Sequence, residues 1–173
     1  MAGAFEAFAA ETLRTVDPTP FREGMARLGA AVNVITTAGA AGRTGFTATA
    51  VCSVSDQPPT LLVCLNRRSR GTPVLRENGV FCVNTLGADS ETIADMFAGR
   101  TGAQGEERFQ IGDWMTLATG SPVLRSAAVA FDCRVIDVKT VATHNVFFAV
   151  VEDVHLGESC PALVYHERCY KKV

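Results

Sequence analysis

The sequence has little excess charge, no long hydrophobic run and no closely spaced pair of cysteines. Its formal net charge is −2, so it carries no broad basic field for the phosphates of a nucleic acid. No apolar stretch reaches the roughly 20 residues that a membrane-spanning helix needs. We therefore expect neither a nucleic acid nor a membrane as a partner.

Six cysteines are present, but no CxxC pair occurs and no secretory hydrophobic segment precedes them. Four of them lie in apolar, strand-like runs, which is typical of reduced, buried thiols rather than of a disulfide framework. The three histidines, His144, His155 and His166, have no partner at the spacing of a zinc site. These patterns predict a cytoplasmic protein without a metal centre.

The length of 173 residues suits one domain with a substantial core. Hydrophobic residues make up 47% of the chain and charged residues 20%, and this apolar surplus predicts burial against a partner subunit as well as in one core. We therefore expect a homodimer. We divide the chain into a helical extension, residues 1–18, and one domain, residues 19–173.

Hydrophobic periodicity and turn residues predict short helices inserted between antiparallel strands. Helices are expected at 4–14, 19–29, 72–78 and 89–99, the second starting at Thr19 and Pro20. Strands are expected at 30–38, 45–51, 61–65, 80–86, 129–138, 145–154 and 162–165. Residues 101–110 and 114–122 are expected to be irregular, and a change of phase at Ile136 predicts a β-bulge. Many short antiparallel strands favour a closed β-barrel over βαβ units.

Residues 44–69 are the most informative stretch. Small hydroxyl and alanine residues come first, then a Pro58-Pro59 turn, then an apolar strand that runs into a polar loop. Hydroxyls and free amides suit phosphate oxygens, and alanine leaves room for a planar ring, so this order predicts a flavin cradle. A plainer interpretation is that the small residues fill a tight barrel interior and that Arg67, Arg68 and Arg70 are solvated.

The chain resembles the short-chain flavin reductase family. The resemblance rests on AAVNVITT, GFTATAVCSVSDQPPTLLVCLN, FCVNTL, EERF, FDCRV and the TH pair at 143–144. Its motifs are similar to those of the reductase components of two-component flavin monooxygenases and of the pyrimidine-utilisation flavin reductases. The resemblance implies a mainly β fold, an antiparallel Greek-key split β-barrel with short flanking helices, that binds FMN as a homodimer.

The resemblance also implies roles for individual residues. Those expected to bind the flavin ring and ribityl chain are Thr47, Ala48, Thr49, Ala50, Ser53, Val54, Ser55, Cys64, Leu65, Asn66 and Asn84. Ser69 and Arg70 would hold the phosphate. His144 would be the catalytic residue at the nicotinamide face, with Tyr165 and Arg168 shaping the nicotinamide pocket. A plainer interpretation of His144 is a surface histidine.

Three functions remain open at this point. The first is an NADH- or NADPH-dependent reductase that supplies reduced FMN, or FAD, to a separate monooxygenase. The second keeps FMN bound and passes electrons to another acceptor, such as a cob(II) corrin in cobalamin biosynthesis. The third is a non-enzymatic flavin- or heme-binding protein, against which the retained GFTATA and TH motifs argue. Hydride transfer to a flavin requires no nucleophile or acid/base pair from the protein.

Overall fold

A computed structural model describes residues 14–173. The chain is mainly β, and its sheets are antiparallel. The helix expected at 4–14 falls almost entirely outside the described residues. Helix α1 spans Pro18–Ala26, so the expected start at Thr19 and Pro20 is wrong by two residues. Pro18 occupies the first turn, where its fixed φ and missing N–H do no harm.

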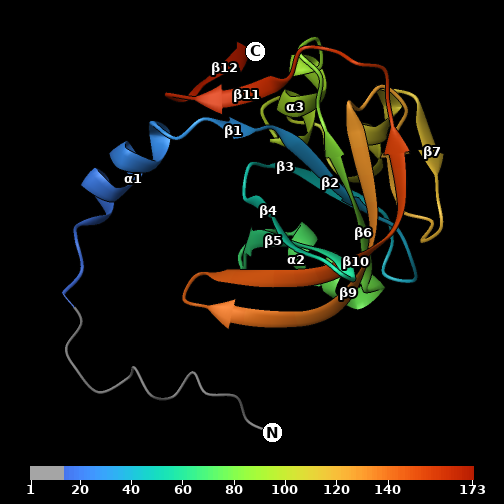
Figure 1. Cartoon of the computed structure of the whole chain (residues 1–173), viewed down its shortest axis with the longest axis horizontal. Coiled ribbons are helices and arrows are strands. Elements are labelled where there is room, and N and C mark those ends of the chain that lie inside the picture. The colour runs from blue at the N-terminus through green and yellow to red at the C-terminus, as the bar shows by residue number, and fades with distance from the viewer. Residues whose placement is uncertain (1–13) are drawn as a thin grey trace, which may run out of the picture.

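A seven-stranded antiparallel sheet carries most of the structure, in the order β3-β2-β6-β9-β10-β5-β4 (Figure 1). Its strands are β2 (Asn33–Thr37), β3 (Thr44–Ala48), β4 (Val51–Asp56), β5 (Pro59–Asn66), β6 (Val80–Thr85), β9 (Val129–Val141) and β10 (His144–Leu156). Strands β3 and β4 form the two edges of the sheet, although only Thr49 and Ala50 separate them in the sequence. The strand expected at 45–51 is therefore two strands.

Two smaller sheets flank the large one. Strands β1 (Ala30–Ala31), β11 (Leu163–His166) and β12 (Cys169–Lys172) form the first, and β7 (Trp114–Thr116) and β8 (Pro122–Leu124) form the second. The second sheet corrects the expectation of irregular chain at 114–122. Trp114 is held there because its indole N–H donates to the Ile111 carbonyl at 2.8 Å.

Three short helices lie between the strands in sequence and pack against edge strand β3. They are α2 (Gly71–Asn78), α3 (Glu91–Phe97) and the 3-10 helix η2 (Gly105–Gln110). Helix α2 ends where Gly79 takes a left-handed φ of 67° and donates its N–H to the Leu75 carbonyl. Helix η2 lies within the stretch expected to be irregular, and Gln104 and Glu107 form a capping box at its start.

The long β9–β10 hairpin contains the bulge that the sequence predicts. Phe148 pairs with Asp137 and Ala149 with Val135, so Ile136 is the extra residue on β9. A second register shift leaves Glu152 extra on β10. Within residues 14–173, no helix is long and apolar enough to cross a membrane.

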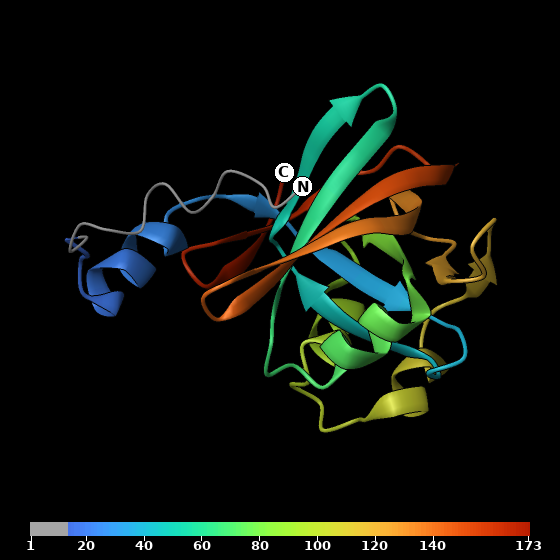
Figure 2. The same ribbon diagram turned by 90° about the horizontal axis from the view of Figure 1, so that it is seen from below.

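Helix α1 lies away from the large sheet, beside the β11–β12 hairpin (Figure 2). Glu167 donates its N–H to the Ala26 carbonyl, and Arg168 forms an ion pair with Glu23. None of the residues of α1 is buried, and Phe21 is 58% exposed. The apolar side of this helix is therefore open to solvent.

Candidate functional site

A cleft of about 460 Å³ opens between strand β3, the start of helix α2 and the segment that follows α3. This volume lies within the usual range for small-ligand sites. Its lining comprises Thr44, Gly45, Phe46, Thr47, Ser69, Arg70, Gly71, Phe97, Ala98, Gly99, Gly102, Ala103, Gln104, Gly105 and Arg108. Small residues dominate this set, so backbone atoms lie at the surface of the cleft.

The charge of the cleft is positive. Arg70 and Arg108 both contribute guanidinium groups, and the lining residues, all from the described part of the chain, include no carboxylate. The start of helix α2 at Gly71 adds the partial positive charge of a helix N-terminus. Cations, hydroxyls and a helix start together suit a phosphate group. The residues present therefore fit the phosphorylated flavin that the family resemblance implies.

Arg108 is fixed by the backbone of the cleft itself. Its Nε donates to the Ala103 carbonyl at 3.0 Å and its Nη1 to the Gly45 carbonyl at 3.1 Å. Arg108 thereby ties the 97–108 segment to strand β3. Arg108 belongs to the EERF motif, and the sequence predicts no role for it because a motif alone does not show which strand its arginine reaches.

Two glycines of the cleft are required by close packing. A Cβ on Gly45 would lie 2.7 Å from the Phe97 ring, and a Cβ on Gly71 would lie 3.0 Å from the Phe46 ring. Phe97 is only 1% exposed, so its ring has little room to move. These glycines let strand β3 approach both helices closely.

Three of the residues expected at the flavin site line this cleft, namely Thr47, Ser69 and Arg70. The Arg70 guanidinium donates to Gln104 Oε1 at 3.2 Å, which directs it toward the 97–108 segment. Ser69 donates its N–H to the Asn66 carbonyl at 3.0 Å. The turn at the end of β5 therefore presents Ser69 and Arg70 to the cleft.

A smaller aromatic niche of about 220 Å³ adjoins the cleft. It is lined by Val32, Thr47, Thr49, Ala98, Arg100, Tyr165 and Tyr170. Thr47 and Ala98 line both cavities. Thr49 and Tyr165 are thus brought to the neighbourhood of the cleft, as expected, while Arg100 and Tyr170 were not among the expected residues.

The other expected residues of β3, of the link to β4 and of the β4–β5 hairpin lie outside the cleft. Ser53 and Ser55 line a separate groove with Phe131 and Val151. Val54 is the bulged residue of edge strand β4 and is 47% exposed. Ala48 pairs with Asn33 in the β2–β3 ladder. The Ala50 carbonyl accepts a hydrogen bond from the Cys64 N–H, and Leu65 is buried in the core.

Asn66 supports the loop rather than facing the cleft. Its carbonyl accepts from the Ser69 N–H and the Thr72 hydroxyl, and its Oδ1 accepts from the Arg68 N–H at 2.9 Å. Asn66 lines a different hollow with Arg67, Arg68, Ala142 and Thr143. His144 lies opposite Asn66 in the β5–β10 ladder and is exposed, with its Nδ1 2.9 Å from the Thr143 hydroxyl. The structure therefore does not bring His144 into the cleft.

Asn84 requires a correction. It is fully buried, and its amide donates to the Val34 carbonyl and the Thr36 hydroxyl, both at 3.1 Å. Its Oδ1 accepts the Leu124 N–H at 2.7 Å. These hydrogen bonds join β2, β6 and β8, so the side chain has a structural role in the core and is not presented to a flavin.

Arg168 also lies elsewhere. It occupies the β11–β12 turn with a φ of 61°, is exposed, and pairs with Glu23 of α1 at 2.6 Å. Within the described chain, the residues lining the cleft and the niche do not include Arg168. The arginine that lines the niche is Arg100.

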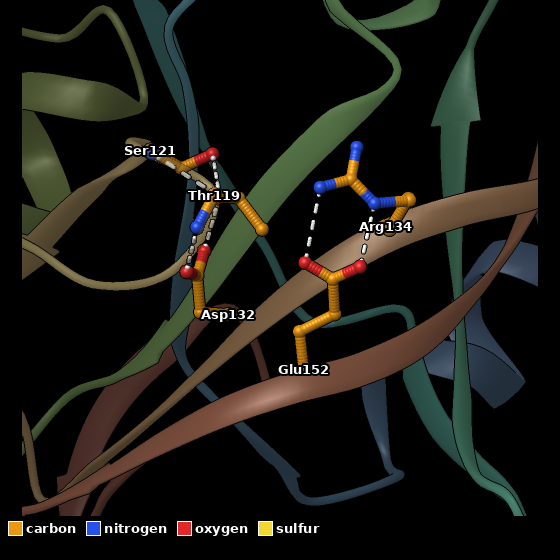
Figure 3. A network of polar contacts seen from close by, with 5 residues as sticks. All are labelled: Thr119, Ser121, Asp132, Arg134 and Glu152. Atoms are coloured by element: carbon orange, nitrogen blue, oxygen red, sulfur yellow. Dashed lines mark hydrogen bonds and ion pairs between the residues drawn. The ribbon is translucent and has the colours of Figure 1, made fainter.

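Asp132 is a buried acid with a structural role (Figure 3). Its carboxylate accepts from the Thr119 N–H at 2.7 Å and from the Thr119 hydroxyl, which also contacts Ser121. Burial raises the pKa of Asp132, and the Thr119 hydrogen bonds partly oppose that rise. The nearby Arg134–Glu152 pair joins β9 to β10 on the surface. Asp132 therefore holds the loop before β8 and is separate from the cleft.

The chain is similar to known proteins both in sequence and in structure. A protein of Agrobacterium fabrum named FMN reductase (NADH) RutF is 52% identical over 151 residues, which are 87% of this chain and 86% of that protein. A protein from Haemophilus somnus 129pt, whose crystal structure is known, is 43% identical in sequence to this chain. The two structures match with a TM-score of 0.87, over 91% of this chain and 100% of the other. BorF, the flavin reductase component of a bacterial two-component tryptophan halogenase, is 28% identical, with a TM-score of 0.84 over 91% of this chain and 98% of BorF.

The family match covers most of the described structure. It extends over residues 25–173 and so includes the cleft, the niche and all three sheets. The chain belongs to the flavin reductase like domain family.

Proposed function

We propose that the protein is a flavin reductase that uses NADH to reduce FMN and releases the reduced flavin to a separate oxygenase. The names of its relatives support this proposal, among them FMN reductase (NADH) RutF at 52% identity. The observation that carries it is the cleft, where two arginines and the start of α2 meet small residues with no carboxylate in the lining. A phosphorylated flavin suits that combination of charge and shape.

The phosphate is assigned to the end of the cleft formed by Ser69, Arg70 and the start of α2. Arg70 is exposed but directed by Gln104, and Arg108 is held by two carbonyls. Pre-positioned guanidinium groups lose little freedom on binding, which favours affinity. The ring and ribityl chain then extend along Thr47 and the Thr49-Ala50 link between β3 and β4.

When bound, the flavin supplies the hydride acceptor, and the chemistry of the transfer is its own. The chain holds the flavin phosphate, shields one face of the cleft from water with Phe46 and Phe97, and offers hydrogen-bond donors to the negative charge that reduction creates.

Homodimer formation is part of the proposal. Helix α1 has no buried residue and exposes Phe21 and Met25, at 58% and 50%. Leu28, just after the helix, is 59% exposed. Apolar surface of this kind is typical of subunit interfaces. We expect a split β-barrel whose α1 is covered by a second copy, and Phe21→Glu should shift the protein toward monomer in sedimentation.

The acceptor is proposed to be a monooxygenase or a similar flavin-dependent partner, as in the two-component system that BorF belongs to. The relatives named here give no support to the corrin alternative. NADH is proposed as the donor and FMN as the flavin; FAD and NADPH are the alternatives that a substrate comparison would test. The cytoplasmic location stays a prediction.

Replacement of Arg70 by glutamine tests the flavin site. Loss of a charge-assisted hydrogen bond should raise the dissociation constant for FMN by roughly tenfold or more. Riboflavin, which lacks the phosphate, should bind as before. Both constants can be measured from the quenching of flavin fluorescence.

Arg76→Gln is the matched control, because Arg76 is exposed on the same helix but at its other end. It should change neither constant. Equal weakening of FMN and riboflavin by Arg70→Gln, or no weakening of FMN, would contradict the assignment of the phosphate to Arg70.

A further inference from the structure

One wall of the flavin cleft is a surface loop whose two ends meet in the core. The chain leaves the core at Phe97 and returns at Phe109, which are 1% and 7% exposed and whose ring centroids are 5.1 Å apart. None of the residues 98–108, which we call the strap, is buried. Compact surface loops with closely spaced ends are frequently functional, and they open at a lower cost than the core.

Glycines set the course of the strap. Gly99, Gly102 and Gly105 have φ values of 77°, 82° and 53°, and all three line the cleft. A Cβ on Gly102 or Gly105 would meet nothing within 4 Å, so these two positions require a left-handed backbone rather than space. The strap therefore takes its shape from its backbone, and burial does not hold it against the cleft.

An ion pair fastens the strap to the chain before strand β3. Arg43 donates from Nε to Glu106, 2.9 Å from Oε2 and 3.2 Å from Oε1. The Arg43 guanidinium also lies 4.3 Å from the centre of the Phe109 ring, which places it beside the buried anchor of the strap. The hydrogen bond from Arg43 lowers the pKa of Glu106, so the carboxylate is charged at neutral pH.

This fastening is exposed to water. The side chains of Arg43 and Glu106 are 38% and 64% exposed. Solvent and salt screen an ion pair in such a position, and it contributes little free energy. A contact of this strength breaks and re-forms readily, as the closing contact of a mobile loop must during turnover.

Arg70 connects the strap to the position assigned to the flavin phosphate. Its Nη1 donates to Oε1 of Gln104 in the strap at 3.2 Å. A guanidinium has five N–H donors, so Arg70 can hold Gln104 and a phosphate oxygen at the same time. Arg108 adds a second connection, because it donates to the Ala103 carbonyl of the strap and to the Gly45 carbonyl of β3. The arginines of the cleft are thus also contacts of the strap.

We propose that the strap is a gate for flavin exchange and that the Arg43–Glu106 ion pair is its latch, so that opening of this pair sets the rate at which flavin leaves the cleft. The inference rests on the proposed function, in which reduced flavin must leave for a separate oxygenase in every cycle. Arg43 and Glu106 are positioning residues in this scheme, because neither belongs to the described residues that line the cleft.

The test measures how fast FMN leaves the full-length protein. FMN-saturated protein is diluted in a stopped-flow instrument without NADH, and the rise in flavin fluorescence gives the release rate constant. Glu106→Gln should raise this constant about two- to fivefold, which corresponds to the loss of an exposed ion pair. Arg43→Gln should raise it by a similar factor, and the Tm of both variants should stay close to that of the wild type.

The pair of variants separates a latch from a direct effect of charge on the phosphate. Removal of the Glu106 charge would by itself strengthen the attraction for phosphate and slow release, whereas removal of the Arg43 charge would speed it. A latch predicts faster release from both. The double variant should release FMN no faster than either single variant, because all three lack the same interaction.

Gly102→Ala tests the strap without a change of charge. Alanine has room there, but a φ of 82° is unfavourable for it, so the substitution strains only the backbone of the strap. It should speed FMN release at least as much as Glu106→Gln does. Gly120→Ala is the matched control, because Gly120 has a φ of 81°, also has nothing within 4 Å of its Cβ position and lies between β7 and β8.

Glu152→Gln is the matched control for the latch. Glu152 forms a two-bond ion pair with Arg134, as Glu106 does with Arg43, but it joins β9 to β10. Neither control should change the release rate constant.

Slower release from Glu106→Gln, or unchanged release from both latch variants, would overturn the assignment of the latch. Unchanged release from Gly102→Ala would overturn the gate. Because release is measured without NADH, a protein that shows the expected release rates but does not oxidise NADH would contradict the proposed function alone. A protein that binds no FMN would contradict both.

Discussion

Replacement of Gly45 by alanine tests how closely strand β3 must pack at the cleft. The new Cβ would lie 2.7 Å and 2.9 Å from two atoms of the Phe97 ring and 3.1 Å from the Ile35 carbonyl oxygen. Phe97 is 1% exposed, and its ring contacts those of Phe109 and Trp114 at 5.1 and 5.5 Å. These neighbouring rings limit how far the Phe97 ring can move, so the added methyl group overpacks the core.

Overpacking of a core costs roughly 1–3 kcal/mol. Alanine recovers about 0.5–1 kcal/mol of the backbone entropy that glycine loses in a strand. We therefore expect the free energy of unfolding to fall by about 1–2 kcal/mol, which lowers the Tm by about 2–8 °C for a domain of this size. The affinity for FMN should fall as well, because Gly45 and Phe97 both line the cleft.

The measurements are a thermal melt and a flavin fluorescence titration. Gly24→Ala is the control, since a Cβ there meets nothing within 4 Å and alanine favours the helix. It should leave the Tm unchanged or higher and FMN binding unaltered. If Gly45→Ala keeps both the Tm and the FMN affinity of the wild type, the close packing of β3 on Phe97 is wrong.

Three further outcomes are expected. Asn84→Ala should lower the free energy of unfolding, measured in urea, by roughly 2–4 kcal/mol because the buried Leu124 N–H loses its acceptor. The FMN affinity of the folded protein should not change. A stable variant that loses FMN would contradict the structural role of Asn84. The raised pKa of Asp132 means that its charge disfavours the native state above that pKa and that the penalty disappears as the pH falls toward the ordinary value. Urea unfolding should therefore show the wild type gaining stability relative to Asp132→Asn as the pH falls from 7 toward the ordinary value of 3.8. A difference that does not change with pH would refute this. Burial raises the pKa of the Cys82 and Cys133 thiols, so both should react with a disulfide reagent only after unfolding, whereas the exposed cysteines react at once.

Local patterns predicted most of the strands and helices because those signals are short-range. The αL glycine that ends α2 and the phase change at Ile136 are each visible within a few residues. The prediction of one strand at 45–51 was wrong because no local signal marks Thr49-Ala50 as the point where the chain passes from one edge of the sheet to the other. The β7–β8 ladder was missed for a related reason, since these strands have only three residues each.

The site was predicted less completely because it depends on which distant elements meet. Ser69 and Arg70 follow the flavin stretch directly and were found, whereas Arg108 and Arg100 come from the segment after α3, which has no periodicity. Asn84 and Arg168 are polar residues of the kinds that a polar site needs. Their partners, Leu124 and Glu23, are 40 and 145 residues away in sequence, so only the fold shows that these side chains are already engaged.

The most direct test of the proposed function is the rate of NADH oxidation by the purified protein, measured with and without FMN in large excess. We expect slow oxidation without added FMN and strong stimulation by it, with many equivalents of FMN reduced per protein. Oxidation that is independent of added FMN, or that proceeds only with a non-flavin acceptor while FMN stays bound, would contradict the proposed function.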